Sequence, residues 1–542
     1  MPLLTTKTTT VKTTTADGKV TTSTTTSKTV TPGPSDEDKT PQVDWTKVTA
    51  DLDSLRSELG VPGASIGVVH KGKLIFTTGL GRRNDVGETV DADTLFQIGS
   101  ISKSFTALAY AMLVDDKKIE WNSKVSAIYP VTFPDEVRTK FTTIVDILAH
   151  KTGLKHHFIT VFIWSEYKEL FSRLEHFEPG FELREQFDYN NPMYSLAGAI
   201  IDELLKEEGG DWNSFIQKRI FEPLGMKDSL TDLRDLPKAE NKSQGYHELD
   251  GELTAYPWEY TFWPGGVSKA AGGLCSSAND FAKYVAFILR KGTLEDGTAL
   301  VTPLSFEKIT AAQSVLPMPA SPAPSVLKTY GMGWMQGHHR GKHVISHSGG
   351  TFGYTCDMWL LPFDDLGVYV FTNSGSGFSR TACSTLIDRV LFPEVEQTFW
   401  IERTKGMTAG FKGMQAAEKQ AKSDARDKNA TASLPLDAYA GTYTSPLFGT
   451  LNLTAPVEGE TYFKFTLAGK QEYLDQKIGG ITGLVGHWQK DTFAIHELIG
   501  LDHDRDFEVP LLELQFEIVD NVIVGVSCPM EQEGIVMKFT RG

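Results

Sequence analysis

Strand-like segments stand at both ends of a long helical stretch, and this order constrains the fold more than any other feature of the sequence. Two strand patterns precede the helical stretch, at residues 64–70 and 74–78, and three follow it, at 343–347, 354–361 and 366–372. From about residue 100 to 300, apolar residues recur with helical spacing instead. One sheet built from both ends of this segment, with the helices packed against it, accounts for the order. The sequence therefore predicts a mixed α/β domain, an α+β sandwich.

The chain on either side of this domain differs in composition, and 542 residues are too many for one core. Residues 1–43 are a Thr-rich, low-complexity tract that we expect to be mostly disordered, with a hairpin turning at Asp17-Gly18 as the alternative. The α/β domain is expected over 44–395, followed by a helical or flexible linker over 396–433. Short alternating strands over 434–542 are typical of a small antiparallel β-barrel or sandwich.

The overall charge and the scarcity of cysteine argue against several partners and settings. A formal net charge of −16, with no cluster of Lys and Arg, argues against binding nucleic acid. No apolar run approaches the roughly 20 residues that cross a bilayer, so no membrane span is expected. The four cysteines include no CxxC pair, and the first residues lack the continuous apolar stretch of a secretory signal. We therefore expect a cytoplasmic protein.

The strongest chemical signal is a serine that precedes a lysine by three residues at the start of an apolar helix. Ser100 and Lys103 then lie on one face of that helix, within reach of each other. A lysine accepts a hydroxyl proton only when its pKa is lowered, and burial in an apolar helix lowers it. The helix N-terminus also leaves backbone amides free, so the Ser100 amide can form half of an oxyanion hole. Taken alone, the pattern favours a capping serine followed by an exposed lysine.

Two further groups follow in an order that favours the chemical interpretation. Tyr189 and Asn191 are expected in a loop before the next helix, where a phenol can relay a proton and an amide can bind a carbonyl group. His347, Ser348, Gly349 and Gly350 fall on a strand near the end of the domain. Glycines there let a substrate approach the sheet edge, and the Gly350 amide can complete the oxyanion hole. The expected site thus has Ser100, Lys103 and Tyr189 as catalytic residues and Asn191 and His347–Gly350 as substrate-binding residues.

The order Ser-x-x-Lys, Tyr-x-Asn and then His-x-Gly resembles the class C β-lactamase and D-alanyl-D-alanine carboxypeptidase family of penicillin-recognising serine hydrolases. The likeness covers roughly residues 45–395. It extends over Phe96–Thr106, Asp146–Leu154, Phe221–Met226, Ala271–Ala278 and Tyr330–Trp334. The segment from Leu436–Tyr443 to Phe539–Arg541 is similar, more loosely, to the lipocalin-like barrel that some members carry.

The resemblance implies a β-lactamase/transpeptidase-like fold and acyl-enzyme chemistry. Ser100 would attack an acyl carbonyl, Lys103 and Tyr189 would manage the proton, and water would release the acyl group. The expected partner is a small-molecule or short peptide substrate, and no cofactor or metal is implied. Whether the chain forms a homo-oligomer is left open. Two alternatives also stay open: an acyltransferase of secondary metabolism that uses the same site, and a non-catalytic binding module.

His347 departs from the resemblance, because β-lactamases of this class usually carry lysine at the matching position. A permanently charged lysine helps to hold the substrate carboxylate, whereas histidine is largely neutral near pH 7. The expected activity therefore shifts toward a peptidase or esterase acting on amides, esters or D-amino acid peptides, and away from efficient penicillin hydrolysis.

Three other patterns suggest sites that the sequence context disfavours, and a fourth fits two interpretations. Ser65 lies in a GxSxG pattern, but it opens a strand that leads into a hairpin, whereas the hydrolase elbow leads into a helix. Lys151-Thr152-Gly153 resembles the third motif of the family but precedes Tyr189. His339, His343 and His347 are spaced by four, yet the Arg340-Gly341 turn places them on strands, so a metallohydrolase is the weaker interpretation. The aromatic residues around 156–164 and 258–263 fit an acyl pocket and ordinary core packing equally well.

Overall fold

The computed structural model describes residues 3–14, 20–31, 43–249, 252–258, 266–317, 324–456, 462–473, 476–498, 501–502, 512–530 and 534–542. Two compact units divide the chain, Met1–Asp44 and Trp45–Gly542. In the first, β1 (Leu3–Thr14) and β2 (Val20–Thr31) pair antiparallel in continuous register from Leu3–Thr31 to Thr14–Val20. This pairing is the one that the hairpin alternative describes. The Asp17-Gly18 turn lies outside the described residues.

One antiparallel sheet of eight strands organises the second unit, and both ends of the predicted domain contribute to it. The spatial order is β4-β3-β14-β13-β12-β11-β10-β9, so the first strands of the domain pair with its last strand. The strands are β3 (Gly63–His70), β4 (Lys73–Gly81), β9 (Ser314–Val315), β10 (Ser325–Tyr330), β11 (Met335–His339), β12 (Lys342–Thr351), β13 (Tyr354–Leu361) and β14 (Leu366–Thr372). The prediction that strands from both ends of the domain form one sheet is confirmed.

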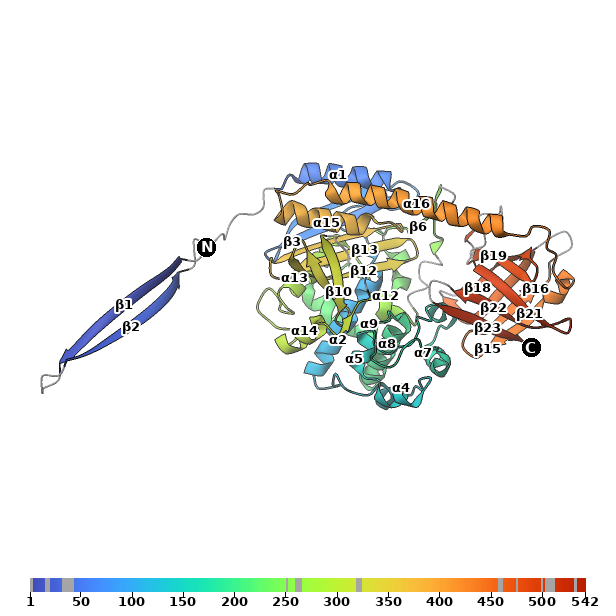
Figure 1. Ribbon diagram of the computed structural model, residues 1–542, viewed down its shortest axis with the longest axis horizontal. Coiled ribbons are helices and arrows are strands. Elements are labelled where there is room, and N and C mark those ends of the chain that lie inside the picture. The colour runs from blue at the N-terminus through green and yellow to red at the C-terminus, as the bar shows by residue number, and fades with distance from the viewer. Residues whose placement is uncertain are drawn as a thin grey trace. The chain divides into compact units, whose positions relative to one another are not determined.

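Helices cover both faces of this sheet (Figure 1). One side carries α1 (Trp45–Glu58), α15 (Phe378–Leu391) and α16 (Phe399–Ala425), and the other carries α2 (Ser102–Asp115), α8 (Asn191–Leu205) and α13 (Ala278–Leu289). The expected linker residues therefore include a long helix, α16. The remaining helices of four or more residues on the α2 side include α3 (Val125–Ile128), α4 (Glu136–Phe141), α5 (Ile144–Leu148), α6 (Thr160–Ile163), α7 (Tyr167–Phe171), α9 (Trp212–Ile216), α12 (Lys269–Gly272) and α14 (Pro303–Thr310).

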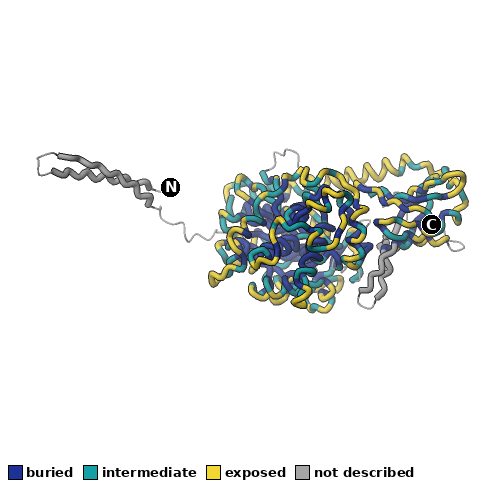
Figure 2. The backbone as a smooth tube through the Cα atoms, turned by 90° about the horizontal axis from the view of Figure 1, so that it is seen from below, coloured by how far each residue is buried: buried dark blue, intermediate teal, exposed yellow. Residues whose placement is uncertain are grey.

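Helix α2 lies in the centre of the hydrophobic core, as its nearly uniform apolar composition predicts. Every residue from Ser102 to Leu113 is buried. Phe105 stacks on Tyr284 of α13 with ring centroids 3.8 Å apart, and the Tyr284 hydroxyl donates a hydrogen bond to Ser104. Figure 2 shows buried backbone concentrated in the interior of the same region. A single turn of 3-10 helix, η1 (Gly99–Ile101), leads into α2 and carries Ser100.

The C-terminal strands close into an eight-stranded antiparallel barrel, which confirms the barrel over the sandwich. The ring runs β18-β17-β16-β15-β23-β22-β21-β19 and closes by pairing β19 with β18, while β20 extends it at β19. Its strands are β15 (Gly441–Ser445), β16 (Gly449–Thr454), β17 (Tyr462–Tyr473), β18 (Gln476–Gln489), β19 (Thr492–Leu498), β20 (Leu501–Asp502), β21 (Leu512–Val519), β22 (Val522–Met530) and β23 (Ile535–Arg541). The compact unit runs on through the barrel, so the domain boundary expected near residue 433 stays a prediction.

Neither a membrane-spanning helix nor a disulfide is found in the described part of the chain. Among the described residues, no helix is both long enough and apolar enough to cross a membrane. All four cysteines are buried and none is in a disulfide.

Candidate active site

Ser100 and Lys103 lie at the junction of η1 and α2, with the lysine completely buried and the serine half-buried. Lys103 Nζ lies 2.9 Å from Ser100 Oγ. The lysine also reaches two acceptors from other elements, Asn191 Oδ1 and the carbonyl oxygen of Ala271, each at 2.7 Å. Three neighbours thus surround the amine, and two of them can only accept a hydrogen bond from it.

Burial determines the protonation state of this lysine. Removal from water disfavours the ammonium form and holds the pKa of Lys103 well below its ordinary value of 10.5. A neutral amine has two N–H groups, and the Asn191 and Ala271 oxygens account for both. Its lone pair is then directed at Ser100, whose hydroxyl can donate to it. The geometry therefore suits proton transfer from Ser100 to Lys103.

Tyr189 approaches the same serine oxygen from a second direction. Its hydroxyl donates a hydrogen bond to Ser100 Oγ at 2.9 Å, and Lys103 Nζ lies 4.9 Å from the centre of its ring. Burial raises the pKa of Tyr189 well above 10, against the opposing effect of its hydrogen bond to Ser100. The phenol is therefore protonated near neutral pH and can deliver a proton at the serine oxygen.

Asn191 is the first residue of α8, whereas the sequence placed it in a loop. The helix already includes Asn191 because Asn190 caps it, accepting a hydrogen bond from the Met193 amide. The Asn191 amide group contacts two partners: Oδ1 accepts from Lys103, and Nδ2 lies 3.1 Å from His156 Nε2. An amide NH₂ group can only donate, so His156 Nε2 is the acceptor. His156 is thereby expected to fix the orientation of the Asn191 amide.

The free end of β12 supplies the other side of the site. β11 pairs with β12 only from Lys342 to Ser346, so the following residues of β12 have β13 on one side alone. Thr351 and Tyr354 face each other across a two-residue turn. Because amides alternate in direction along a strand, the Gly350 N–H then points away from β13.

Two glycines bring this strand end against η1. A side chain on Gly99, which has φ +50°, would place its Cβ 2.7 Å from the Gly350 nitrogen. One on Gly349 would place its Cβ 2.0 Å from the Ile98 carbonyl oxygen and 3.2 Å from the Ser100 nitrogen. The amides of Ser100 and Gly350 are therefore close together beside Ser100 Oγ, the arrangement that an oxyanion hole requires.

His347 is buried and stays uncharged. Its Nδ1 lies 2.6 Å from the Ser348 carbonyl oxygen, so Nδ1 carries the proton, and Nε2, at 3.1 Å, accepts from the Tyr330 hydroxyl. Burial lowers the pKa of His347 to about 3. The side chain is therefore a neutral group held by two hydrogen bonds.

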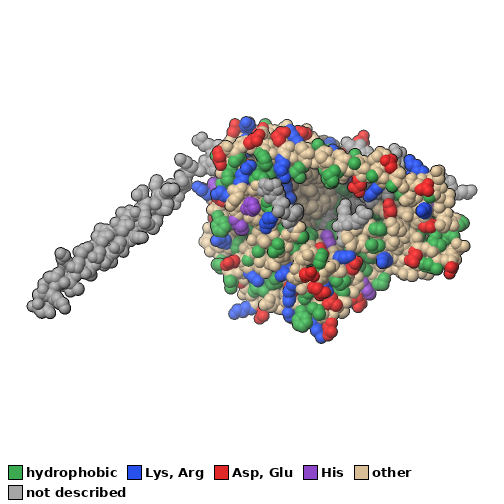
Figure 3. All heavy atoms as spheres, viewed as in Figure 1, with side chains coloured by type: hydrophobic (Ala, Val, Ile, Leu, Met, Phe, Trp, Pro, Cys, Tyr) green, Lys and Arg blue, Asp and Glu red, His purple; other side chains and the backbone are tan. Residues whose placement is uncertain are grey.

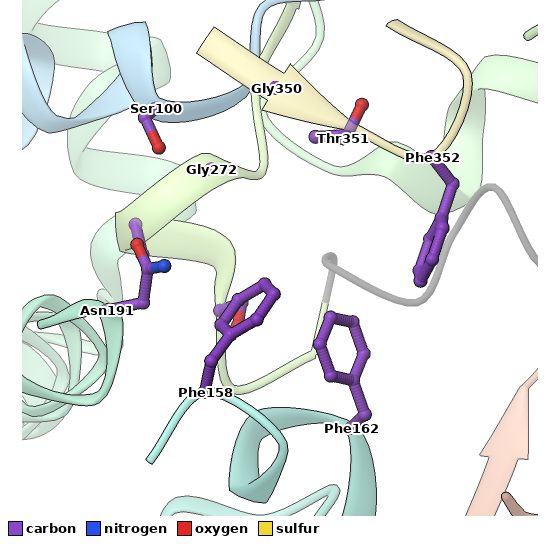
Figure 4. Close-up of a pocket in the computed structure, with 10 residues that line it drawn as sticks. Ser100, Phe158, Phe162, Asn191, Gly272, Gly350, Thr351 and Phe352 are labelled. Atoms are coloured by element: carbon purple, nitrogen blue, oxygen red, sulfur yellow. The ribbon is translucent and has the colours of Figure 1, made fainter. Parts of the chain in front are cut away.

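A cavity of about 280 Å³ opens beside Ser100 (Figure 4). Its polar side presents Ser100, Asn191 and Gly350, and its apolar side presents the rings of Phe158, Phe162 and Phe352. Among the residues that the structure describes, none that lines the cavity carries a formal charge. Figure 3 shows acidic and basic side chains interspersed over one face of the molecule, which is also hollowed near its centre.

The patterns that the sequence context disfavoured lie outside this arrangement. Ser65 is fully buried in β3, and its hydroxyl donates to the Asp91 carbonyl oxygen at 3.3 Å. Lys151–Gly153 form a turn held by Arg138, whose Nε donates to the Thr152 carbonyl oxygen. His339 contacts Asp388 and His343 is exposed, so neither joins His347. Within the described part of the chain, no group of His, Cys, Asp and Glu could hold a metal ion.

Sequence reasoning missed the partners that hold the site residues in place. His156 and Tyr330 were not assigned roles, and Ala271 was quoted only as part of a family motif. The contact between Lys103 and Ala271 joins residues 168 positions apart. The sole available signal was the run Ala271–Ala278, which does not reveal that a backbone carbonyl faces the lysine.

The chain is similar to known proteins over most of its length. The family model described as Beta-lactamase matches residues 48–392. The chain is 27% identical over 433 residues to "Unguisins hydrolase ungD" of Aspergillus violaceofuscus, covering 72% of this chain and 73% of the relative. It is 25% identical over 329 residues to "Protein flp" of Staphylococcus aureus, covering 59% of this chain and 61% of the relative.

Solved structures share the fold over nearly the whole chain. The penicillin-binding protein homologue from Pyrococcus abyssi, described as octameric, superposes with a TM-score of 0.57 at 23% identity, covering 92% of this chain and all of the neighbour. The structure titled "Crystal structure of SurE with D-Leu" superposes with a TM-score of 0.51 at 17% identity, covering 92% of this chain and 99% of the neighbour.

Proposed function

The chain belongs to the β-lactamase family, and on that premise we propose that it is a serine hydrolase acting on amide or ester substrates through an acyl-enzyme at Ser100. The observation that carries the proposal is the contact between Ser100 Oγ and two groups of opposite function. A buried Lys103 amine of lowered pKa lies 2.9 Å away, and a protonated Tyr189 phenol donates at the same distance. A relative named as a hydrolase supports the reaction class.

The proposed reaction has two halves. The Ser100 hydroxyl transfers its proton to Lys103 as its oxygen attacks the substrate carbonyl carbon, and the Ser100 and Gly350 amides stabilise the oxyanion. The C–N or C–O bond of the substrate breaks as Tyr189 protonates the leaving group, and Lys103 returns the proton to Tyr189. Water then attacks the acyl-enzyme carbonyl carbon while Lys103 accepts its proton, and the bond to Ser100 Oγ breaks as Lys103 passes that proton to the serine oxygen.

His347 favours a peptidase or esterase over a penicillinase. A substrate carboxylate is held best by a permanent cation, and the neutral His347 side chain offers none. The proposed substrates are therefore amides, esters or short peptides, D-amino acid peptides included, that do not depend on a carboxylate contact at this position.

Detection of the acyl-enzyme tests this proposal. The protein is mixed with a p-nitrophenyl ester, and the reaction is quenched in acid within one turnover. Mass spectrometry then measures the mass of the intact protein, and peptide mapping locates the added acyl group. We expect the mass on Ser100 in the wild type and none in Ser100→Ala. Acylation elsewhere, or hydrolysis without any acyl-enzyme under these conditions, would contradict the proposal. Adding an alcohol or amine acceptor separates hydrolysis from acyl transfer, because a transferase forms the new ester or amide in preference to the free acid.

A further inference from the structure

The apolar wall of the cavity is built from one short segment that the C-terminal barrel also contacts. This segment is residues 155–164; Phe158 precedes α6 and Phe162 lies within it, with ring centroids 4.7 Å apart in an edge-to-face arrangement. Phe162 reaches across the cavity to Phe352, in the turn between β12 and β13, at 5.6 Å. Three rings thus line the side of the cavity opposite Ser100 (Figure 4).

Three other residues of the same segment contact the barrel: Trp164, His157 and Lys155. The Trp164 indole N–H donates to the Leu447 carbonyl oxygen at 3.1 Å. His157 lies 6.2 Å from Phe448, measured between ring centres, and the Lys155 ammonium donates to the Gly534 carbonyl oxygen at 3.0 Å.

The barrel turn that makes two of these contacts is buried, although turns are normally exposed. Leu447 and Phe448, between β15 and β16, are only 5% and 4% exposed. Phe448 also contacts Phe539 of β23 at 6.1 Å, which ties the turn to the barrel interior. Buried apolar side chains in a turn indicate a built contact and not a chance approach of two surfaces.

Trp164 is the central member of this contact. It is 8% exposed, and the Arg173 guanidinium lies over its ring at 3.8 Å. The indole is therefore held on one face by a cation and at its N–H by the barrel, two residues beyond the Phe162 ring that faces the cavity. A movement of Trp164 changes the position of Phe162 because α6, Thr160–Ile163, is a single turn of helix.

The chemistry of the cavity restricts what it can bind. The described residues of its lining are uncharged, the two N–H groups of a neutral Lys103 are already donated, and His347 is neutral and hydrogen-bonded at both nitrogens. A charged group would lose its hydration without gaining a partner, which is costly. A volume of about 280 Å³ is at the small end for ligand sites, so one side chain-sized group fits.

We propose that the three-phenylalanine cavity binds the uncharged, apolar acyl side chain of the substrate, and that the barrel sets this preference by holding Trp164 and thereby Phe158 and Phe162. This inference rests on the proposed function and adds the substrate class and a positioning residue. Trp164 touches neither Ser100 nor the reacting atoms. Its effect is on selection among acyl groups, not on the chemical step.

Three p-nitrophenyl esters test the substrate class: the acetate, the phenylacetate and the 4-carboxyphenylacetate. In the wild type, kcat/KM for phenylacetate should exceed that for acetate by about 10-fold or more, after correction for intrinsic reactivity. The carboxylate analogue should lose about 10-fold or more relative to phenylacetate, because it places an unpaired charge in the cavity. Equal acceptance of the carboxylate analogue would overturn the substrate class.

Paired variants test the barrel's part. Trp164→Ala, and Phe448→Ala from the barrel side, should each reduce the phenylacetate-to-acetate ratio about 10-fold while acetate kcat/KM changes by less than about 3-fold. Trp488→Ala is the matched control, since Trp488 also lies under an arginine, Arg426, at 4.0 Å, but belongs to β18 away from the cavity lining. If the alanine variants show no cooperative unfolding transition and are therefore not folded, the milder variants Trp164→Phe and Phe448→Leu replace them in the same measurement. An unchanged ratio in folded variants would overturn the barrel's role.

A second readout keeps this inference separate from the proposed function. This readout is the rate at which phenylmethanesulfonyl fluoride sulfonylates Ser100, divided by the rate for methanesulfonyl fluoride. The measurement does not depend on substrate turnover, because the serine oxygen displaces fluoride directly. The wild type should favour the phenylmethyl reagent, and Trp164→Ala should lose that preference. If Ser100→Ala kept ester hydrolysis, the proposed function would fail. If Ser100 were essential and neither ratio changed in the Trp164 and Phe448 variants, only the present inference would fail.

Discussion

The Nζ atom of Lys103 lies 2.9 Å from Ser100 Oγ and has no exposed surface. A lysine in this position is normally an energetic burden, because burial opposes its charge. Here the same burial favours the neutral amine, whose two hydrogens can be donated to the Asn191 and Ala271 oxygens. The proposed reaction depends on that arrangement, and the predictions below address its separate parts.

Removing the amine should abolish most of the activity without unfolding the chain. Lys103→Met keeps the length and apolar stem of the side chain but has no proton acceptor. Loss of a general base typically costs about 10²–10⁴-fold in rate, and we expect kcat/KM for a p-nitrophenyl ester to fall within that range. Lys118→Met is the control, because Lys118 pairs with Glu208 at the surface. A Lys103→Met enzyme within about 10-fold of the wild type would contradict the role of the amine.

The pH dependence of the wild type should report the same group. Only the neutral amine can accept the serine proton, so kcat/KM should rise with pH as Lys103 deprotonates. The pKa of Lys103 is lowered by burial, so this rise should be complete well below pH 10.5. A rise centred near pH 10.5 would show that the lysine is not desolvated. Residual activity of Lys103→Met should lack the rise.

Buried histidines should make the fold sensitive to acid. Burial lowers the pKa of His157 to about 4, with Lys155 lowering it further and Glu178 opposing, whereas the unfolded chain titrates near 6.5. The unfolded state then binds more protons between those pH values, so the free energy of unfolding falls as pH falls from about 6.5 to 4. In His157→Gln, Tm measured from pH 7.5 to 4.5 should fall less steeply than in the wild type. The exposed His176→Gln should leave the slope unchanged; equal slopes in all three proteins would refute the assignment.

His156 should act through Asn191 and not on the substrate. His156→Leu removes the acceptor for the Asn191 NH₂ group, so the amide is free to turn and lose its contact with Lys103. We expect kcat to fall about 10-fold, with KM little changed, since one buried hydrogen bond of this kind contributes about 1–3 kcal/mol. His156→Gln retains an acceptor and should recover most of the loss. Failure of glutamine to do better than leucine would indicate a purely steric role.

Replacing His347 by lysine should alter substrate preference. A permanent cation at this position supplies the carboxylate partner that the neutral histidine lacks. In His347→Lys, the rate of acylation by a carboxylate-bearing penicillin, divided by the rate of acylation by a neutral ester, should rise about 10-fold. A 10-fold change in this ratio corresponds to about 1.4 kcal/mol. His347→Gln, neutral and similar in length, should leave the ratio unchanged. A similar rise in both variants would exclude charge as the cause.

The elements of the fold follow from local patterns, whereas the partners within the site do not. The apolar run from Ile101 to Val114 predicts a buried helix, and the observed α2, Ser102–Asp115, differs by one residue at each end. The strand patterns at both ends of the domain predict the sheet, because alternation and turns are local properties. Asn191 was expected in a loop but begins α8, since a Tyr-Asn-Asn run does not reveal which asparagine caps the helix.

Contacts between distant residues explain the rest of what the sequence could not predict. Trp164 and Leu447 meet across 283 positions, and no periodicity in either segment indicates the other. The same holds for Lys103 with the Ala271 carbonyl oxygen, where the acceptor is backbone and thus carries no side-chain signal. Whether Phe158 and Phe162 packed in the core or lined a cavity was undecidable from composition, because both environments favour phenylalanine.

Hydrolysis of a short p-nitrophenyl ester by the wild type and by Ser100→Ala, purified side by side, tests the central claim most directly. The nucleophile hydroxyl is the one group that the proposed chemistry cannot replace, so the folded variant should lose about 10³-fold or more in kcat. Comparable hydrolysis by Ser100→Ala and an active wild type would contradict the account, because the bond-breaking step would then not pass through Ser100.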